Sequence, residues 1–339
     1  MNGRSLLLGL LGGLVLSHAA ASASAGDPNN ITGSRGVILI DKVGERVRFL
    51  APGTLKEISS ITVGVKPHEV AISPDRRTAY VTIYGDGIYG DNPHPGRTIA
   101  VIDIAAKKQI DTIEVSPQVA PHSIMIDRKG TLYVTCDESR RLLIINPKTK
   151  RIEASIDTEG TGHFFAVTPD GAKAYVANKS DRPYVSVIDT RARKIVARIP
   201  TPSGTEGVSI SPDGKRVAIA DHSSQILIVD TATDAIVKTV KLDGGLARGA
   251  LRTRYSPDGK YLLTSGTGAQ ANLFRVADLS KQTVLVVGRN AMGTAFGPDG
   301  KTAFVANHGE GTISVVDLKS AQVTRKFTAG DGIENIAFY

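Results

Sequence analysis

Residues 168–178 read TPDGAKAYVAN, and this stretch decides the fold because it joins a tight turn directly to a β-strand. In the turn, proline presets φ, the aspartate side chain caps the backbone, and glycine accepts a positive φ. The YVAN end combines aromatic and β-branched residues, which favour strands. The stretch therefore predicts the hairpin that opens one antiparallel unit of a sheet.

The same unit recurs six times along the chain. Its turns are Ser73-Pro74-Asp75-Arg76, Asp127-Arg128-Lys129-Gly130, Thr168-Pro169-Asp170-Gly171, Ser211-Pro212-Asp213-Gly214, Ser256-Pro257-Asp258-Gly259 and Gly297-Pro298-Asp299-Gly300. Successive turns lie 54, 41, 43, 45 and 41 residues apart. A period near forty with four short strands per repeat is typical of a β-propeller.

The two ends of the chain predict a seventh blade. Residues 333–339 have the pattern of an innermost strand with nothing after it, while residues 37–40, 46–50 and 56–63 have the pattern of three strands without one. Combining them closes the ring and leaves no open circular edge. We therefore expect an all-β fold, a seven-bladed β-propeller of four-stranded blades whose ring is closed by a composite N-/C-terminal blade.

The second strands of several repeats share a sequence motif. It appears as Tyr80-Val81-Thr82, Tyr133-Val134-Thr135, Tyr175-Val176-Ala177-Asn178 and Phe304-Val305-Ala306-Asn307. With the Pro-Asp-Gly turns, it resembles the YVTN-repeat β-propeller family of exported bacterial proteins, in the lactonase-like and quinoprotein-like superfamily, over residues 35–339. Such proteins include lactonases, quinoprotein subunits, copper or haem enzymes and plain binding proteins, so the resemblance implies the fold and leaves the chemistry open.

The N-terminal segment predicts export. Arg4 and the amino terminus precede a short apolar run, and small residues follow it up to Ala25, as in a cleaved secretory signal peptide. We expect a signal peptide at residues 1–25, a single propeller domain at 26–339, and a periplasmic or secreted location without a transmembrane segment after cleavage. Cys136 is the one cysteine of the sequence, so the fold is expected to form without an internal disulfide.

Aligning the repeats on their turns predicts a functional face. The position six residues before the turn proline begins each innermost strand, beside the central channel. It is occupied by His68, His122, His163, Glu206, Leu251 and Met292, with Glu334 in the composite blade. Imidazole and carboxylate groups are the usual ligands of Zn, Fe, Mn or Cu, so His68, His122, His163, Glu206 and Glu334 are candidate metal ligands.

Loops between the second and third strands reach the same face. They carry His94, within a long loop at residues 85–97, together with His222 and His308, and also Tyr84, Asp137 and Lys179. Arg248 takes the place of Leu251 if the fifth repeat contains a small insertion. A purely structural interpretation competes with the metal site, because imidazoles at such positions can bond nearby backbone and line a watery channel.

Three functions remain open from the sequence. The first is a binding or accessory protein of the cell envelope whose partner is a small molecule or an envelope protein. The second is a metal-dependent hydrolase or oxidoreductase at the His/Glu site. The third, a binder of single-stranded nucleic acid or another polyanion, agrees with the net charge of +8 but not with the 5% aromatic content, because base stacking needs exposed aromatic residues.

Overall fold

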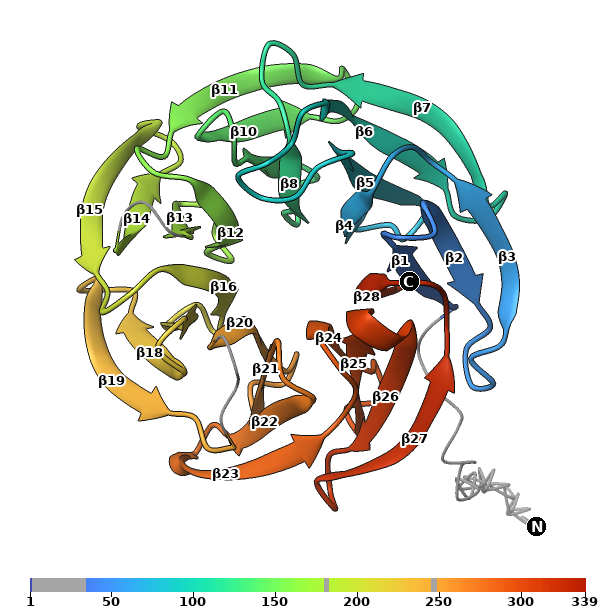
Figure 1. Cartoon of the computed structure of the whole chain (residues 1–339), viewed down its shortest axis with the longest axis vertical. Coiled ribbons are helices and arrows are strands. Elements are labelled where there is room, and N and C mark those ends of the chain that lie inside the picture. Colours follow the sequence, from blue (N-terminus) through green and yellow to red (C-terminus); the bar gives the residue numbers. More distant parts are fainter. Residues whose placement is uncertain (2–34, 180–182, 245–248) are drawn as a thin grey trace.

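The computed structural model describes residues 1, 35–179, 183–244 and 249–339, and it confirms the seven-bladed propeller. Seven four-stranded antiparallel sheets stand around a central channel (Figure 1). The predicted signal peptide lies outside the described residues except for Met1, and Arg248 lies outside them too. In the described part of the chain, no helix is both long and apolar enough to cross a lipid bilayer.

Each blade contributes one strand to the channel and a second strand behind it. The innermost strands are β4 (Pro67–Ile72), β8 (Pro121–Ile126), β12 (Gly162–Val167), β16 (Thr205–Ile210), β20 (Ala250–Tyr255), β24 (Ala291–Phe296) and β28 (Ile333–Phe338). The second strands are β5 (Thr78–Gly85), β9 (Leu132–Cys136), β13 (Lys173–Asn178), β17 (Arg216–Asp221), β21 (Tyr261–Gly266), β25 (Thr302–Asn307) and β1 (Val37–Asp41).

Two further strands complete each blade toward the rim. The third strands are β6 (Pro95–Asp103), β10 (Arg141–Asn146), β14 (Tyr184–Asp189), β18 (Gln225–Asp230), β22 (Gln270–Arg275), β26 (Thr312–Asp317) and β2 (Arg46–Leu50). The outermost strands are β7 (Lys108–Glu114), β11 (Arg151–Asp157), β15 (Lys194–Pro200), β19 (Ala235–Lys241), β23 (Asp278–Val286), β27 (Gln322–Thr328) and β3 (Glu57–Thr62). A short 3₁₀ helix, η1 (His308–Glu310), follows β25.

The composite blade closes the ring as predicted. Its strand order is β28-β1-β2-β3, and Val37 of β1 lies opposite Phe338 of β28. Figure 1 shows the C-terminal strand beside the first strands of the chain. Main-chain hydrogen bonds between segments this far apart in sequence give the propeller a closed circle of blades instead of an open edge.

The hydrophobic core lies between neighbouring blades. Both faces of the second and third strands are covered, so a strand such as Leu142–Ile145 of β10 is buried throughout. Outermost strands are more exposed, and in β15 burial alternates along the strand because one of its faces meets solvent. One buried cluster joins Ile38 and Phe49 of the composite blade to Val81 and Ile102 of the next blade, which ties the closure to the core.

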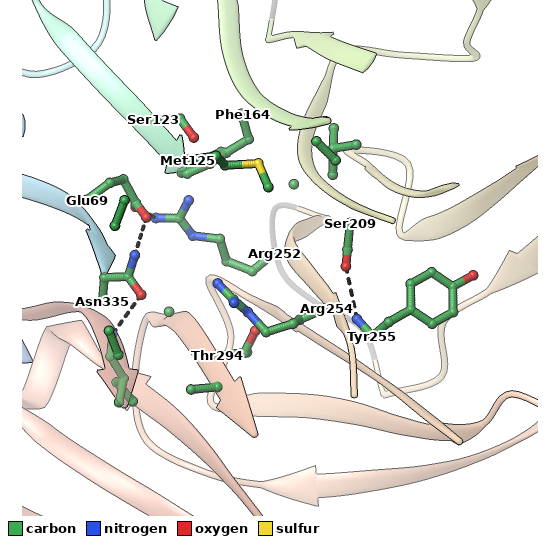
Figure 2. Close-up of a pocket in the computed structure, with 18 of the residues that line it drawn as sticks. Glu69, Ser123, Met125, Phe164, Ser209, Arg252, Arg254, Tyr255, Thr294 and Asn335 are labelled. Atoms are coloured by element: carbon green, nitrogen blue, oxygen red, sulfur yellow. Dashed lines mark hydrogen bonds and ion pairs between the residues drawn. The ribbon is translucent and has the colours of Figure 1, made fainter. Parts of the chain in front are cut away.

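The central channel contains two cavities with Arg252 at the wall of both. The mouth cavity, of about 290 Å³, opens where the chain enters the innermost strands. The turn-side cavity, of about 550 Å³, opens at the other end, where the Pro-Asp turns lie, and Figure 2 shows residues that line it. The guanidinium of Arg252 stacks over the ring of Phe164, with its carbon 3.6 Å from the ring centroid.

Candidate functional site

The mouth cavity is lined by all five candidate metal ligands of the repeat alignment: His68, His122, His163, Glu206 and Glu334. Each lies at a register shift of its innermost strand. Such β-bulges place two residues opposite one and redirect side chains. The repeated bulge therefore explains why equivalent positions of five blades face the same end of the channel.

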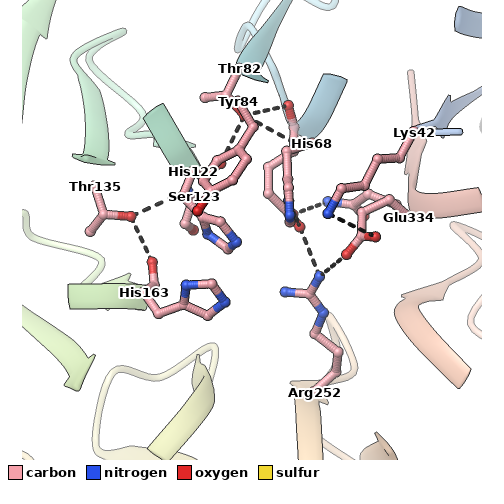
Figure 3. A network of polar contacts seen from close by, with 12 residues as sticks. Lys42, His68, Thr82, Tyr84, His122, Ser123, Thr135, His163, Arg252 and Glu334 are labelled. Carbon is pink, nitrogen blue, oxygen red and sulfur yellow. Dashed lines mark hydrogen bonds and ion pairs between the residues drawn. The ribbon is translucent and has the colours of Figure 1, made fainter. Parts of the chain in front are cut away.

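Threonine hydroxyls fix two of these histidines. The hydroxyl of Thr82 donates to the backbone carbonyl of His122 (2.8 Å), and that of Thr135 donates to the backbone carbonyl of His163 (2.6 Å), as Figure 3 shows. Each hydroxyl also accepts a hydrogen bond from a bulged N–H of its own blade, that of Glu69 or Ser123. Each threonine of the YVT motif thus joins its own bulge to the histidine of the following blade.

The three imidazoles form a buried stack. Ring centroids lie 4.0 Å apart for His68 and His122, and 3.6 Å apart for His122 and His163. Burial, followed by nearby positive charge, holds the pKa of His68 and of His122 well below the usual histidine range. Both rings are therefore neutral at pH 7, with lone pairs free for a ligand. His122 is 1% exposed, and neither of its ring nitrogens has a hydrogen-bond partner among the described residues.

His163 is oriented by carboxylates on both sides. Its Nδ1 lies 3.3 Å from Oδ2 of Asp137, and its Nε2 lies 3.5 Å from Oε1 of Glu206. Asp137 is fully buried and also accepts a hydrogen bond from the hydroxyl of Tyr84 (3.3 Å). A carboxylate beside an imidazole fixes its tautomer and ring direction, as in many metal and acid–base sites.

Glu206 is an ionised carboxylate. Burial acts to raise its pKa, but hydrogen bonds with His163 and His222 and the charge of Lys179 outweigh burial and hold the pKa well below its usual range. The ammonium of Lys179 lies 3.3 Å from Oε1, and Nε2 of His222 lies 3.1 Å from Oε2. Lys179 also lies over the ring of Tyr89, 4.7 Å from its centroid.

Glu334 is held in a corresponding way on the other side of the mouth. Arg252 contacts its Oε1 through Nη2 (2.7 Å), while Lys42 and His308 approach Oε2 at 3.8 and 3.4 Å. Burial would raise the pKa of Glu334, but Lys42 and Arg252 lower it overall. The same Nη2 lies 3.0 Å from Oε1 of Glu69, whose pKa burial raises to about 7.

Two groups of side chains have the spacing of metal ligands. Within each group, one ligand atom per residue lies within 4.8 Å of the others: His122, Asp137 and His163 form one group, and His68, Glu69 and Glu334 form the other. In the second group the Arg252 guanidinium already sits between the two carboxylates. In the first group, no lysine or arginine of the described ranges contacts Asp137 in this way, so this group is the better candidate for an ion.

Only some of the loop residues predicted to reach this face contribute to the mouth cavity. Ile88 and Tyr89 of the long loop line the mouth cavity, and the Tyr89 ring lies 5.5 Å from that of His163. His94, expected to join this face, instead points to solvent with its side chain 81% exposed, because Asp86 of the same loop holds its Nδ1 at 2.6 Å. His222 and His308 reach the site indirectly, by contacting Glu206 and Glu334.

The fifth blade differs from the alignment. Leu251 is buried away from the cavity, and Arg252 lines it instead. The register of β20 shifts between Ala250 and Arg252, so the bulge lies at Leu251 as the turn spacing predicts, but the following residue, Arg252, is the one that lines the cavity. The alignment also misses Lys42, which follows the second strand of the composite blade. Lys42 is the residue directly after β1, just as Lys179 is the residue directly after β13, so the same rule applied to the composite blade predicts it.

Comparison with known proteins gives one family and supports the fold. A family profile described as "Domain of unknown function (DUF5074)" matches residues 100–333. No curated protein sequence matches the chain.

Two solved structures share the architecture. Hydrazine synthase of Kuenenia stuttgartiensis has a TM-score of 0.66 and 20% identity, with 79% of this chain and 88% of that chain covered. A functionally unknown protein from Desulfotomaculum acetoxidans DSM 771 has a TM-score of 0.74 and 14% identity, with 90% and 99% covered. At these identities the similarity shows the fold alone.

Proposed function

This chain belongs to the DUF5074 family, which is defined by a domain of unknown function, and we propose that it is an exported binding protein that holds a divalent transition-metal ion at the mouth of its channel. The protein ligands are His122, His163 and Asp137. The proposed export rests on the signal-like sequence of residues 1–25, and the proposed metal site rests on the geometry of the mouth cavity.

One observation carries the proposal: the imidazole of His122 is buried, neutral and without a hydrogen-bond partner at either ring nitrogen among the described residues. Leaving a buried polar atom unpaired costs about 1–3 kcal/mol. A metal ion at this position would satisfy one nitrogen with a strong bond. His163 and Asp137 supply the remaining donors from neighbouring blades.

The spacing of these donors suits an ion. Two ligands bound at about 2.0–2.2 Å in tetrahedral geometry lie about 3.4 Å apart, close to the 3.3 Å between Nδ1 of His163 and Oδ2 of Asp137. With Nδ1 on the ion, Nε2 carries the ring proton and donates toward Glu206. Two histidines and a carboxylate, with further positions open to the cavity, suit zinc, iron or manganese.

Binding also requires a movement of the stack. Two imidazoles that share a tetrahedral ion have ring centroids about 5 Å apart, whereas those of His122 and His163 are 3.6 Å apart. One ring must therefore rotate so that a gap opens between the two rings for the ion. His122 is the more mobile candidate, because no hydrogen bond to a described residue holds its ring, while Asp137 and Glu206 flank His163.

A metal-dependent hydrolase is the second candidate. It is favoured by the cations Lys42, Lys179 and Arg252 around the cavity, because positive groups beside a metal ion can stabilise an oxyanion as it develops. Metal-dependent turnover of a simple lactone that disappears in Lys179→Met would assign the protein to this class. If the metal-loaded protein shows no turnover, the hydrolase is ruled out for this substrate and metal binding stays as the proposed function.

The test is a metal titration of the mature, untagged protein after treatment with a chelator. We expect one equivalent of Zn²⁺ or Co²⁺ to bind, and His122→Ala to weaken binding at least a hundredfold. His94→Ala is the matched control, because it removes an exposed histidine outside the cavity and leaves affinity unchanged. Equal affinity of wild type and His122→Ala, or no stoichiometric binding by wild type, would overturn the proposal.

A further inference from the structure

The turn-side cavity is a second candidate site at the opposite end of the channel (Figure 2). Its volume of about 550 Å³ lies within the range of pockets that bind small molecules, about 300–1,000 Å³. Its floor is the layer in which Arg252 stacks on Phe164 and contacts Glu69, and the side-chain amide of Asn335 donates to the same glutamate. None of the proposed metal ligands, His122, His163 and Asp137, lines this cavity.

Arg254 is a charged residue in a layer of the wall that is otherwise uncharged. Arg254 of β20 occupies the next-to-last position of its innermost strand, and the equivalent position of each other blade pairs with the second strand in the same register. The residues at those six positions are small, apolar or both: Ala71, Met125, Ala166, Ser209, Ala295 and Ala337. A single arginine among seven equivalent positions is therefore not required by the repeat.

Arg254 has no direct ion-pair partner among the described residues. Its side chain makes no hydrogen bond or ion pair with any residue in the described ranges, and the residue is solvent-exposed inside the cavity. Of the other charged residues in the wall, Glu69 and Arg252 pair with each other. Desolvation by the channel walls lowers the pKa of the Arg254 guanidinium overall, although the charge of Glu69 acts to raise it, and the charge of Arg252 also lowers it. An arginine nevertheless stays protonated at neutral pH, so the cavity wall keeps an unbalanced positive charge.

A second donor lies on the neighbouring strand. The hydroxyl oxygen of Ser209 accepts a hydrogen bond from the backbone N–H of Tyr255 (3.0 Å), as Figure 2 shows. Its own proton therefore remains available to an acceptor. Ser209 and Arg254 hold equivalent positions on the adjacent strands β16 and β20, so both donors belong to the same layer of the channel wall.

Apolar side chains form part of the remaining wall, beside polar residues such as Thr253, Thr294 and Asn335. Ile72, Met125, Val208, Ile210 and Phe296 line the cavity around this polar pair. An inorganic anion would use the charge of Arg254 but leave this surface in contact with water. A ligand with an apolar body would also gain about 25 cal/mol for each Å² of apolar surface that it buries.

We propose that the turn-side cavity binds a small organic anion, whose carboxylate or phosphate head pairs with Arg254 and Ser209 and whose apolar body lies against Met125, Val208 and Phe296. This site is separate from the metal ligands and does not depend on them. The head group gains a charge-assisted hydrogen bond in a partly desolvated setting, where such bonds are stronger than in water.

The experiment uses octanoate and inorganic phosphate as probes, titrated separately into the mature protein by calorimetry in the presence of a chelator. We expect saturable octanoate binding that weakens at least tenfold in Arg254→Gln and is partly retained in Arg254→Lys. Arg191→Gln is the matched control, because Arg191 is an exposed arginine in the β14–β15 turn and its loss changes net charge equally. Affinity in this control should equal that of wild type.

Three outcomes would overturn the proposal: no saturable binding of octanoate, equal octanoate affinity in wild type and Arg254→Gln, or phosphate binding as tightly as octanoate. Thermal unfolding with and without octanoate checks that Arg254→Gln is folded and has lost only the ligand-induced shift. His122→Ala should bind octanoate normally, so failure of the metal proposal and failure of this one are distinguishable.

Discussion

The hydroxyl of Thr135 in β9 donates a 2.6 Å hydrogen bond to the backbone carbonyl of His163 in the next blade. The same oxygen accepts from the N–H of Ser123, at the bulge of its own blade. One side chain thus satisfies two buried backbone groups that the bulge leaves outside the regular ladder. The YVT motif therefore has a positioning role at the channel mouth in addition to its strand propensity.

Replacing Thr135 by valine should test this role. The change keeps the shape of the side chain and leaves both backbone groups unpaired, so we expect the free energy of unfolding to fall by about 2 kcal/mol. Metal affinity should fall as well, because His163 loses its anchor. Denaturant unfolding and metal titration provide the measurements. Thr239→Val, at an exposed position of β19, is the control, and an equal loss in both variants would contradict the proposed role.

Arg252 should be the most sensitive charged residue of the channel. It is the cation nearest to both Glu69 and Glu334, at 3.0 and 2.7 Å. Arg252→Met removes the guanidinium that contacts two buried carboxyl groups. This change should lower the free energy of unfolding by about 3–5 kcal/mol. Adding Glu334→Gln to this variant should restore part of the loss.

The control for this experiment is Arg275→Met, which removes an exposed arginine that lies over Tyr261. Its effect should stay below about 1 kcal/mol. If Arg252→Met is no more destabilising than this control in denaturant unfolding, the ion pairs of the channel do not support the fold.

Glu69 should make stability fall as pH rises. Burial raises the pKa of this group to about 7 in the folded protein, from 4.5 as the reference value for an exposed glutamate. Between these values the folded state binds more protons than the unfolded state, so the contribution of Glu69 is fully present below pH 4.5 and is lost as pH rises through 7. The stability of wild type relative to Glu69→Gln should therefore decrease between pH 4.5 and 8.

Chemical unfolding over this pH range, with the exposed Glu153→Gln as baseline, measures the effect. The expected change is on the order of 1–3 kcal/mol. A difference between wild type and Glu69→Gln that is constant across the range, or that grows with pH, would contradict a protonated Glu69 in the folded state.

The fold was predictable because its signals are local and repeated. Each turn fixes one hairpin, five of the six turns contain Pro-Asp, and six repeats with a period near forty leave few architectures other than a propeller. The split blade was also predictable, since unmatched strands at the two ends of the chain can complete each other. The predicted segments at 37–40 and 333–339 agree with β1 (Val37–Asp41) and β28 (Ile333–Phe338) to within one residue.

The site was only partly predictable. Turn spacing identified which residues begin the innermost strands, but it did not give side-chain direction at each bulge. At the bulge of β20, Arg252 lines the cavity and the aligned residue, Leu251, does not. Contacts between side chains far apart in the sequence could not be predicted either. Arg252 contacts Glu69, 183 positions away, and no local pattern predicts that partnership. The stacked rings of His122 and His163 likewise depend on the curvature of the ring of blades.

Anomalous scattering from zinc-loaded crystals tests the proposed metal site most directly. We predict one peak about 2.0–2.3 Å from a ring nitrogen of His122, Nδ1 of His163 and a carboxylate oxygen of Asp137, with the two ring centroids moved from 3.6 Å to about 5 Å apart. Crystals whose zinc lies elsewhere, or whose imidazole stack stays closed with no peak beside it, would contradict the account.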